Sequence, residues 1–206
     1  MKIDRIAYFF LGNNVVIGPR VKRRLEFLRG KVPSSFKHRQ TDDLGCGDGK
    51  ITLLLKEIFL PTRLRGFDIN PRQVRRAKGR GIEAEVKNLE ADMPTGELAV
   101  MWGVLHHIED VEGCLKRVKE NYALIFIREP IKNGLIKWWG ELGHPLRKRE
   151  FEYLVEQHLA GSQIFYHNND ILIFYASPKR NRRTVRAKEE LLSQVSRKNR
   201  RKLHEP

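Results

Sequence analysis

Three glycines at alternate positions, Gly45, Gly47 and Gly49, constrain the fold of this chain more than any other feature. They follow residues 41–44, which have the character of a strand end, and precede residues 51–58, whose apolar side chains form one broad helical face. Glycine allows a sharp turn and lets a ligand approach the backbone without a Cβ in the way. The first N–H groups of the following helix suit a carboxylate or a phosphate. The segment therefore predicts a strand, a ligand-binding loop and a helix in succession.

Strand and helix patterns continue to alternate along residues 38–177. We expect further strands at 64–68, 82–86, 98–102 and 122–127, and helices that begin at Pro71 and span 111–120. Near the end, segments 162–167 and 171–177 flank a turn at Asn168-Asn169-Asp170 and predict a hairpin. The predicted fold class is therefore α/β, a doubly wound and mostly parallel sheet with a C-terminal antiparallel hairpin. Ligands of such sheets bind beyond the carboxyl ends of the strands.

Charge divides the chain unevenly. The formal net charge is +15, and residues 178–206 contribute about half of it, with 11 Lys or Arg against 3 Asp or Glu. This last segment has no aromatic residue and too few apolar residues to form a core of its own. We therefore predict an N-terminal helical extension at 1–37, an α/β domain at 38–177 and a basic tail at 178–206.

Composition limits the classes of protein that fit. Cys46 and Cys114 are the only cysteines, which excludes a disulfide scaffold and fits a reducing compartment. No apolar run approaches the roughly 20 residues that cross a bilayer as a helix. We expect a cytoplasmic protein without a transmembrane segment.

A carboxylate follows the glycine loop at a spacing that nucleotide-binding folds use. Asp68 lies 19 residues past Gly49, at the end of the second expected strand, where a carboxylate can accept both hydroxyl protons of a ribose. The chain lacks the Gly-x-Gly-x-x-Gly/Ala motif of dinucleotide-binding folds, because Lys50 stands where the last glycine or alanine of that motif would be. The Gly-Lys-Ser/Thr sequence of a P-loop is also absent at this loop.

An Asp followed by three alternate glycines, from Asp43 to Gly49, resembles the first motif of class I S-adenosylmethionine-dependent methyltransferases. Two segments extend the resemblance: Gly66-Phe67-Asp68-Ile69-Asn70, and Gly103-Val104-Leu105-His106-His107-Ile108-Glu109-Asp110, which is similar to the turn after the family's fourth strand. The resemblance covers about residues 38–130 and extends toward 177. It implies a Rossmann-like methyltransferase fold, S-adenosylmethionine as cofactor and S-adenosylhomocysteine as product.

The resemblance also implies which residues hold the cofactor. The methionine part would lie against Asp43 and the loop residues Gly45, Cys46, Gly47 and Gly49. Asp68 would bind the ribose hydroxyls, Ile69 would pack on the adenine, and Asn88 and Leu89 would lie at the adenine edge. Trp102 and Gly103 would line the pocket beside the methionine chain.

Residues after the fourth and fifth expected strands are candidates for chemistry. His106 and His107 could accept a proton from a hydroxyl acceptor, although one of them could instead cap or pack the next helix. No Cys, His or Asp cluster accompanies them, so we expect no metal site. Arg128 could hold an anionic acceptor and Glu129 could orient an amine or a hydroxyl, unless the two form a plain surface pair. Trp138 could form an apolar wall for the substrate, or belong to the core.

Two further basic segments precede the tail. Residues 20–29 predict a basic amphipathic helix, and the helix after Pro71 carries Arg72, Arg75, Arg76 and Lys78. Together with the tail they could contact RNA or another polyanion, while a solvated tail with no partner is equally consistent with this composition.

We predict methyl transfer to an O or N nucleophile, with a small-molecule acceptor slightly favoured. An RNA methyltransferase and a non-catalytic cofactor- or nucleic-acid-binding protein are the alternatives.

Overall fold

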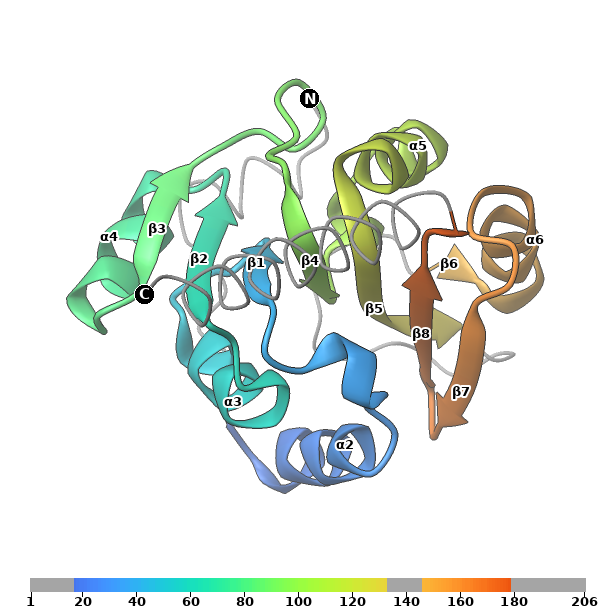
Figure 1. Cartoon of the computed structure of the whole chain (residues 1–206), viewed down its shortest axis with the longest axis horizontal. Coiled ribbons are helices and arrows are strands. Elements are labelled where there is room, and N and C mark those ends of the chain that lie inside the picture. Colours follow the sequence, from blue (N-terminus) through green and yellow to red (C-terminus); the bar gives the residue numbers. More distant parts are fainter. Residues whose placement is uncertain (1–16, 133–145, 179–206) are drawn as a thin grey trace, which may run out of the picture.

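A computed structural model describes residues 17–132 and 146–178 of the chain. An eight-stranded sheet runs through it, and seven strands follow the order β3-β2-β1-β4-β5-β8-β7 (Figure 1). The strands are β1 (Gln40–Leu44), β2 (Arg63–Asp68), β3 (Glu83–Val86), β4 (Gly96–Trp102), β5 (Tyr122–Lys132), β6 (Leu146–Arg147), β7 (Gln163–His167) and β8 (Asp170–Ala176). The helices are α2 (Pro19–Arg29), α3 (Lys50–Phe59), α4 (Pro71–Gly79), α5 (Val111–Asn121) and α6 (Lys148–His158), with short 3-10 turns η1 (Ser34–Phe36) and η2 (Leu105–His107).

The first five strands are parallel, and β8 is antiparallel to both of its neighbours. The order reverses between β1 and β4, which places the switch point of the sheet beside the glycine loop. The hairpin closes through a two-residue loop, since His167 pairs with Asp170 and Asn168 takes a left-handed φ of 55°. The predicted doubly wound sheet with an antiparallel C-terminal hairpin is confirmed.

Helices cover both faces of the sheet. In Figure 1, α2 and α3 lie on one side, and α5 and α6 on the other. Side chains of the central strands alternate between the two layers: Val100 and Phe126 pack with α2 and α3, whereas Met101 and Ile125 pack with α5 and α6. Burial on both faces is the reason why β5 reads as a nearly continuous apolar run.

Helix α2 shares the core of the sheet. Leu25 and Leu28 are buried in the same apolar cluster as residues of α3, β4 and β8. The ring of Phe27, which also belongs to α2, stacks on the ring of His167 in the hairpin, with ring centroids 4.4 Å apart. The basic amphipathic helix predicted at 20–29 is therefore present, and the boundary predicted at residue 37 falls between elements that pack together. The basic tail lies outside the described residues.

One expectation for the chain after residue 127 needs correction. Strand β5 continues to Lys132, because it pairs with β8 through Glu129 and Pro130, so Arg128 and Glu129 lie within the strand instead of after it. Lys148 begins helix α6. Trp138 lies outside the described residues. In the part of the chain that the structure describes, no helix has the length and apolar character needed to cross a membrane.

Candidate functional site at the carboxyl ends of the strands

The glycine loop connects β1 to α3 with three left-handed residues. The φ angles of Gly45, Gly47 and Gly49 are 86°, 53° and 82°. At Gly49 a Cβ would collide with Ile82 and crowd the backbone of α4, so glycine is required for packing there. At Gly47 a Cβ would meet nothing within 4 Å. The centre of the loop therefore borders open space, where a ligand can approach the backbone.

Asp68 at the end of β2 is bonded to this loop. Its Oδ2 accepts the backbone N–H of Gly47 and its Oδ1 that of Asn70, each at 2.8 Å, and the residue is only 2% exposed. Asp68 is not the cap of the following helix. Asn70 has that role, because its side-chain oxygen accepts the N–H groups of Arg72 and Gln73. The carboxylate that we predict to bind the ribose hydroxyls therefore lies directly beside the loop that we predict to hold the methionine part of the cofactor.

The residues expected around the adenine have different exposures. Ile69 is 40% exposed although it is apolar, and it follows Asp68 directly. Asn88 is exposed, and its side-chain oxygen accepts the N–H of Glu90 at 3.1 Å. Leu89 is buried in the core that contains Phe67, so its side chain supports this region from within. An apolar side chain at the surface beside the ribose carboxylate is what stacking on a purine requires.

Asp43, the first residue of the motif, is buried with an incomplete set of partners. Its Oδ2 accepts the Thr52 hydroxyl at 2.6 Å, while its Oδ1 accepts no hydrogen bond from any described residue. Burial raises the pKa of Asp43 to about 7, and the nearby charge of Asp68 adds to this effect. Asp43 and Thr52 also line a small cavity between β1 and α3.

Asp48 was missed by the sequence reasoning. It lies within the glycine loop and is 4% exposed. Its Oδ1 accepts the N–H of Lys50 at 3.3 Å, and its Oδ2 pairs with Lys50 and with Arg80. The start of α3 therefore already has a carboxylate of its own chain, which limits its role as an open anion site. An acid immediately before a helix was the signal that could have indicated this.

The loop after β4 is attached to β5 by Glu129. The Oε1 atom of Glu129 accepts the N–H groups of Val104 and Leu105 at 2.6 and 2.7 Å, and its Oε2 lies 2.7 Å from Nδ1 of His106. Although burial acts against ionisation, His106 and the Leu105 N–H hold the pKa of Glu129 below its ordinary value. Glu129 therefore does not form the surface pair with Arg128 that the sequence allowed.

His106 and His107 form the short turn η2. His106 is buried and His107 is half-buried, and their ring centroids are 4.1 Å apart. Neither caps helix α5, since the side chain of Asp110 accepts the N–H of Gly113 at its start. Among the residues described, no three His, Cys, Asp or Glu side chains gather as they would around a metal ion.

Arg128 is turned inward. It is 2% exposed and forms an ion pair with Asp170 of β8, which Arg24 of α2 also contacts at 2.5 Å. Its guanidinium lies 5.3 Å from the ring centre of Trp102. Trp102 itself is half-buried and packs against Phe126 on the α2 and α3 side. An anionic acceptor would thus have to compete with Asp170 for Arg128.

These features define the class of the protein. A doubly wound sheet, an open glycine loop after β1 and a carboxylate at the end of β2 form a Rossmann-like domain built to bind a nucleoside. In comparison with known proteins, residues 43–122 match the model of a methyltransferase domain. Over this segment the chain is similar to methyltransferase domains.

Relatives in sequence cover short segments. A methionine S-methyltransferase of Wollastonia biflora is 45% identical over 42 residues, which are 20% of this chain and 4% of the plant enzyme. An uncharacterised methyltransferase of Mycobacterium tuberculosis is 32% identical over an alignment of 107 residues, and the match covers 45% of this chain. The chain spans 53% of the length of this mycobacterial relative.

Solved structures share the fold over most of the chain. Magnesium protoporphyrin IX methyltransferase from Synechocystis, crystallised with S-adenosylhomocysteine, has a TM-score of 0.62 at 11% identity and covers 84% of this chain and 97% of its own. A methyltransferase from Mesorhizobium loti has a TM-score of 0.56 at 15% identity and covers 73% and 96%. These likenesses establish the fold.

Proposed function

We propose that the chain binds S-adenosylmethionine and transfers its methyl group to an oxygen or nitrogen nucleophile of a small molecule. The proposal depends on the hydrogen bond from the Gly47 N–H to Asp68. This bond holds a carboxylate suited to ribose hydroxyls beside a loop with open space at its centre. The match of residues 43–122 to a methyltransferase domain supports the same function.

The residues present suit this cofactor. The open side of Gly47 admits the methionine chain to the backbone. Asp68 is positioned for the ribose hydroxyls, and the exposed side chain of Ile69 next to it suits the adenine face. Asp43, at the start of the loop, retains a buried oxygen with no partner in the described chain, which suits the ammonium of the methionine end.

The cofactor supplies a methyl group on a positively charged sulfur, which a nucleophile attacks in line. The chain contributes by holding both reactants in place, which supplies most of the acceleration in such transfers. Trp102 and Gly103 lie at the end of β4, beside the predicted methionine chain. A hydroxyl acceptor must lose its proton as the new bond forms, and we assign this role to His106 or His107.

A small acceptor is favoured by the relatives that match this chain in sequence, because the plant enzymes among them are named for methionine.

An RNA acceptor is the second candidate, and one observation favours it. Helix α4 starts just after Ile69, exposes Arg72, Arg75 and Lys78, and contains no acidic residue. If phosphates bind there, transfer to RNA should fall steeply with salt.

Cofactor binding is tested by calorimetry with S-adenosylmethionine. Loss of the ribose contacts in Asp68→Ala should cost about 1.5–3 kcal/mol, roughly 10- to 150-fold in Kd. Glu57→Ala, an exposed carboxylate on α3, is the matched control and should bind as the wild type does. Equal affinity of Asp68→Ala and the wild type would contradict the assignment.

Catalysis needs a separate test, because a domain can bind the cofactor without transferring the methyl group. Labelled methyl transfer into a cell lysate, separated afterwards into metabolites, RNA and protein, identifies the acceptor class. Label in the metabolite fraction is expected. Label confined to RNA would support the second candidate, and binding without any transfer would support a non-catalytic protein.

A further inference from the structure

Strand β7 forms one edge of the sheet, beyond β8 (Figure 1). Within residues 17–132 and 146–178, β8 is the only strand that pairs with it. An unpaired strand edge is a template for another strand, and proteins commonly protect it with a charged side chain, a proline or a bulge. The sequence of β7, Gln163–His167, contains no Pro, Asp, Glu, Lys or Arg, and its register with β8 is unbroken. This edge therefore lacks the usual protection.

The backbone groups at the outer side of β7 belong to Ile164 and Tyr166. Ser177 and Asn169, one at each end of β8, both form backbone hydrogen bonds of 2.8 Å with β5. Because the direction of these groups alternates along a strand, the odd-numbered residues of β8 face β5 and the even-numbered ones face β7. The register pairs the even-numbered residues with positions 163, 165 and 167. The N–H and C=O groups of Ile164 and Tyr166 consequently point outward.

Apolar side chains lie beside these outward-pointing groups. Ile164 is 37% exposed and Tyr166 is 43% exposed. Both are on the α6 face of the sheet, where the Tyr166 hydroxyl bonds to Glu152 and Nζ of Lys148 lies 4.3 Å from the centre of the Tyr166 ring. Phe165 packs against the apolar cluster on the opposite face. The edge thus offers backbone hydrogen bonds and apolar contact to the same partner.

The other edge of the sheet, β3, differs in charge. Glu83 and Glu85 are both exposed there, and Glu83 pairs with Arg63. Two antiparallel copies of β3 would bring acidic side chains together, which opposes strand pairing. Of these two edges, β7 is the one whose charge permits a second strand.

The sequence of β7 is complementary to itself. In an antiparallel pair, outward-pointing residues of the two strands face each other and exchange N–H···O bonds. The register that uses both such residues sets Ile164 opposite Tyr166 of the second copy, with Phe165 facing its own counterpart at the two-fold axis. Pairing an aromatic with a β-branched side chain is favourable across strands, and no like charges meet in this register.

Helix α6 carries a self-complementary row of charges beside β7. Lys148, Glu152 and Glu156 follow one another at four-residue spacing, so they lie along one side of the helix. Lys148 and Glu152 contact Tyr166, which places this row next to β7. A two-fold axis makes the two α6 helices run in opposite directions. The Lys148 end of each row then lies opposite the Glu156 end of the other, which favours this orientation electrostatically.

We propose that β7 is the interface through which two copies of this chain associate, so that their sheets join into one continuous sheet across a two-fold axis at Phe165. A strand edge and one helix form a small interface, and we expect a dissociation constant in the micromolar range. The proposal is independent of the cofactor and the acceptor, because β8, β5 and β4 separate β7 from β1 and its glycine loop.

Two substitutions at one residue test the strand pairing. Ile164→Lys adds a charge at the edge, as natural sheets do to block association. Ile164→Pro removes only an N–H that the hairpin does not use, and proline is tolerated where the N–H of an edge strand faces solvent. The matched control is Val86→Lys, which places the same charge at an exposed position of the other edge strand.

Association is measured by sedimentation velocity of the full chain between about 1 and 200 µM. We expect the wild type and Val86→Lys to form a dimer with the same dissociation constant, and both Ile164 variants to raise it at least about tenfold. A wild type that stays monomeric over this range would overturn the proposal. So would either Ile164 variant if it associates as tightly as the wild type.

A charge exchange tests the orientation of the two copies. Lys148→Glu should weaken the dimer at least about threefold, and adding Glu156→Lys to it should restore the wild-type dissociation constant within about twofold. Both positions are on the surface of α6, so the fold should tolerate the changes. A double variant as weak as Lys148→Glu alone would overturn the antiparallel arrangement.

Discussion

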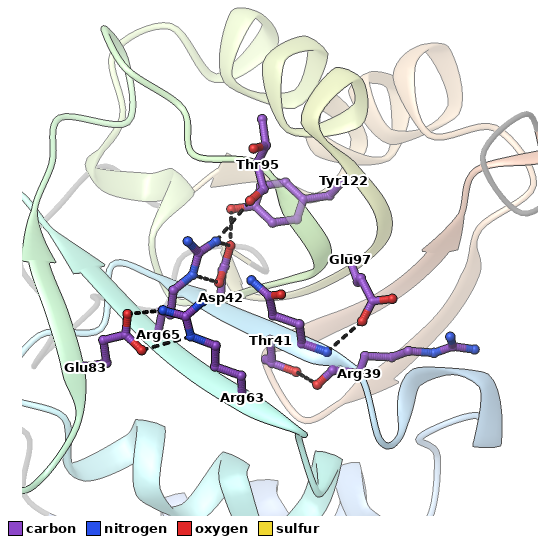
Figure 2. Close-up of polar contacts among 10 residues, drawn as sticks. Arg39, Thr41, Asp42, Arg63, Arg65, Glu83, Thr95, Glu97 and Tyr122 are labelled. Carbon is purple, nitrogen blue, oxygen red and sulfur yellow. Dashed lines mark hydrogen bonds and ion pairs between the residues drawn. The ribbon is translucent and has the colours of Figure 1, made fainter. Parts of the chain in front are cut away.

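Asp42 and Asp43 are neighbours on β1 whose side chains point to opposite faces of the sheet, and the two carboxylates have very different surroundings. Asp42 is fully buried and fully partnered: Arg65 binds both of its oxygens, at 2.8 and 2.6 Å, and the Tyr122 hydroxyl donates to it at 2.8 Å (Figure 2). Arg65 also donates to the carbonyl of Thr95. This network connects β1, β2 and the beginnings of β4 and β5.

Asp43 faces α3 and has only Thr52 as a described hydrogen-bond partner. The difference between the two carboxylates follows the two faces of the sheet. A buried charge whose partners are complete, such as Asp42, fixes the register of strands. A buried carboxylate with an open position, such as Asp43 beside the glycine loop, keeps a binding capacity that a ligand can satisfy. Three substitutions test this contrast.

The largest effect is expected for Asp42→Ala. Removing one partner of a buried ion pair leaves the other uncompensated, which costs about 3–5 kcal/mol of unfolding free energy. Arg63→Ala is the control, since the Arg63–Glu83 pair in Figure 2 is exposed and should contribute little. Urea denaturation measures both. A loss in Asp42→Ala no larger than in Arg63→Ala would show that the network is not a structural element.

A pH-dependent effect is expected for Asp43→Asn. The folded pKa of about 7 lies above the ordinary value of 3.8, so the wild type loses stability as the pH rises between about 4 and 7. The loss amounts to at most about 4 kcal/mol, since each pKa unit is worth about 1.4 kcal/mol. Asp43→Asn cannot ionise and should lack this decline. Urea denaturation at pH 4.5 and pH 8 checks it, and parallel curves for both proteins would contradict the prediction.

A smaller effect is expected for Tyr122→Phe. The substitution removes one hydrogen bond to the Asp42 carboxylate and keeps the ring in the core, so the unfolding free energy should fall by about 1.5–3 kcal/mol. Tyr153→Phe, at an exposed position on α6, serves as the matched control and should be neutral. A neutral Tyr122→Phe would mean that Arg65 alone satisfies Asp42.

Local patterns were sufficient to predict the first half of the fold. The glycine loop, the strands that flank it and the helix at Pro71 depend on periodicity, glycine and proline, all of which act within a few residues. The contacts of Glu129 and Arg128 could not be predicted in this way, because they join residues 25 and 42 positions apart. Tertiary pairing with β8 likewise extended β5 beyond its apolar run.

The residues of the site divide in the same way, into those that a local motif predicts and those that depend on contacts between distant segments. Asp43, Asp68 and the glycines are local to their motifs, and the structure brings Asp68 within hydrogen-bond distance of Gly47. Asp48 and Glu129 act through packing, so their roles emerged only when the loops were seen beside the elements that they contact. From the sequence, Glu129 could be identified only as a residue that could orient an amine or a hydroxyl.

A crystal structure of the complex with S-adenosylhomocysteine would decide whether the carboxyl end of β1 and β2 is the cofactor site. The ribose hydroxyls should lie within hydrogen-bond distance of the Asp68 carboxylate, and the amino-acid end should lie against Gly47. A ligand bound elsewhere, with Asp68 still bonded to the N–H groups of Gly47 and Asn70, would contradict the proposed function.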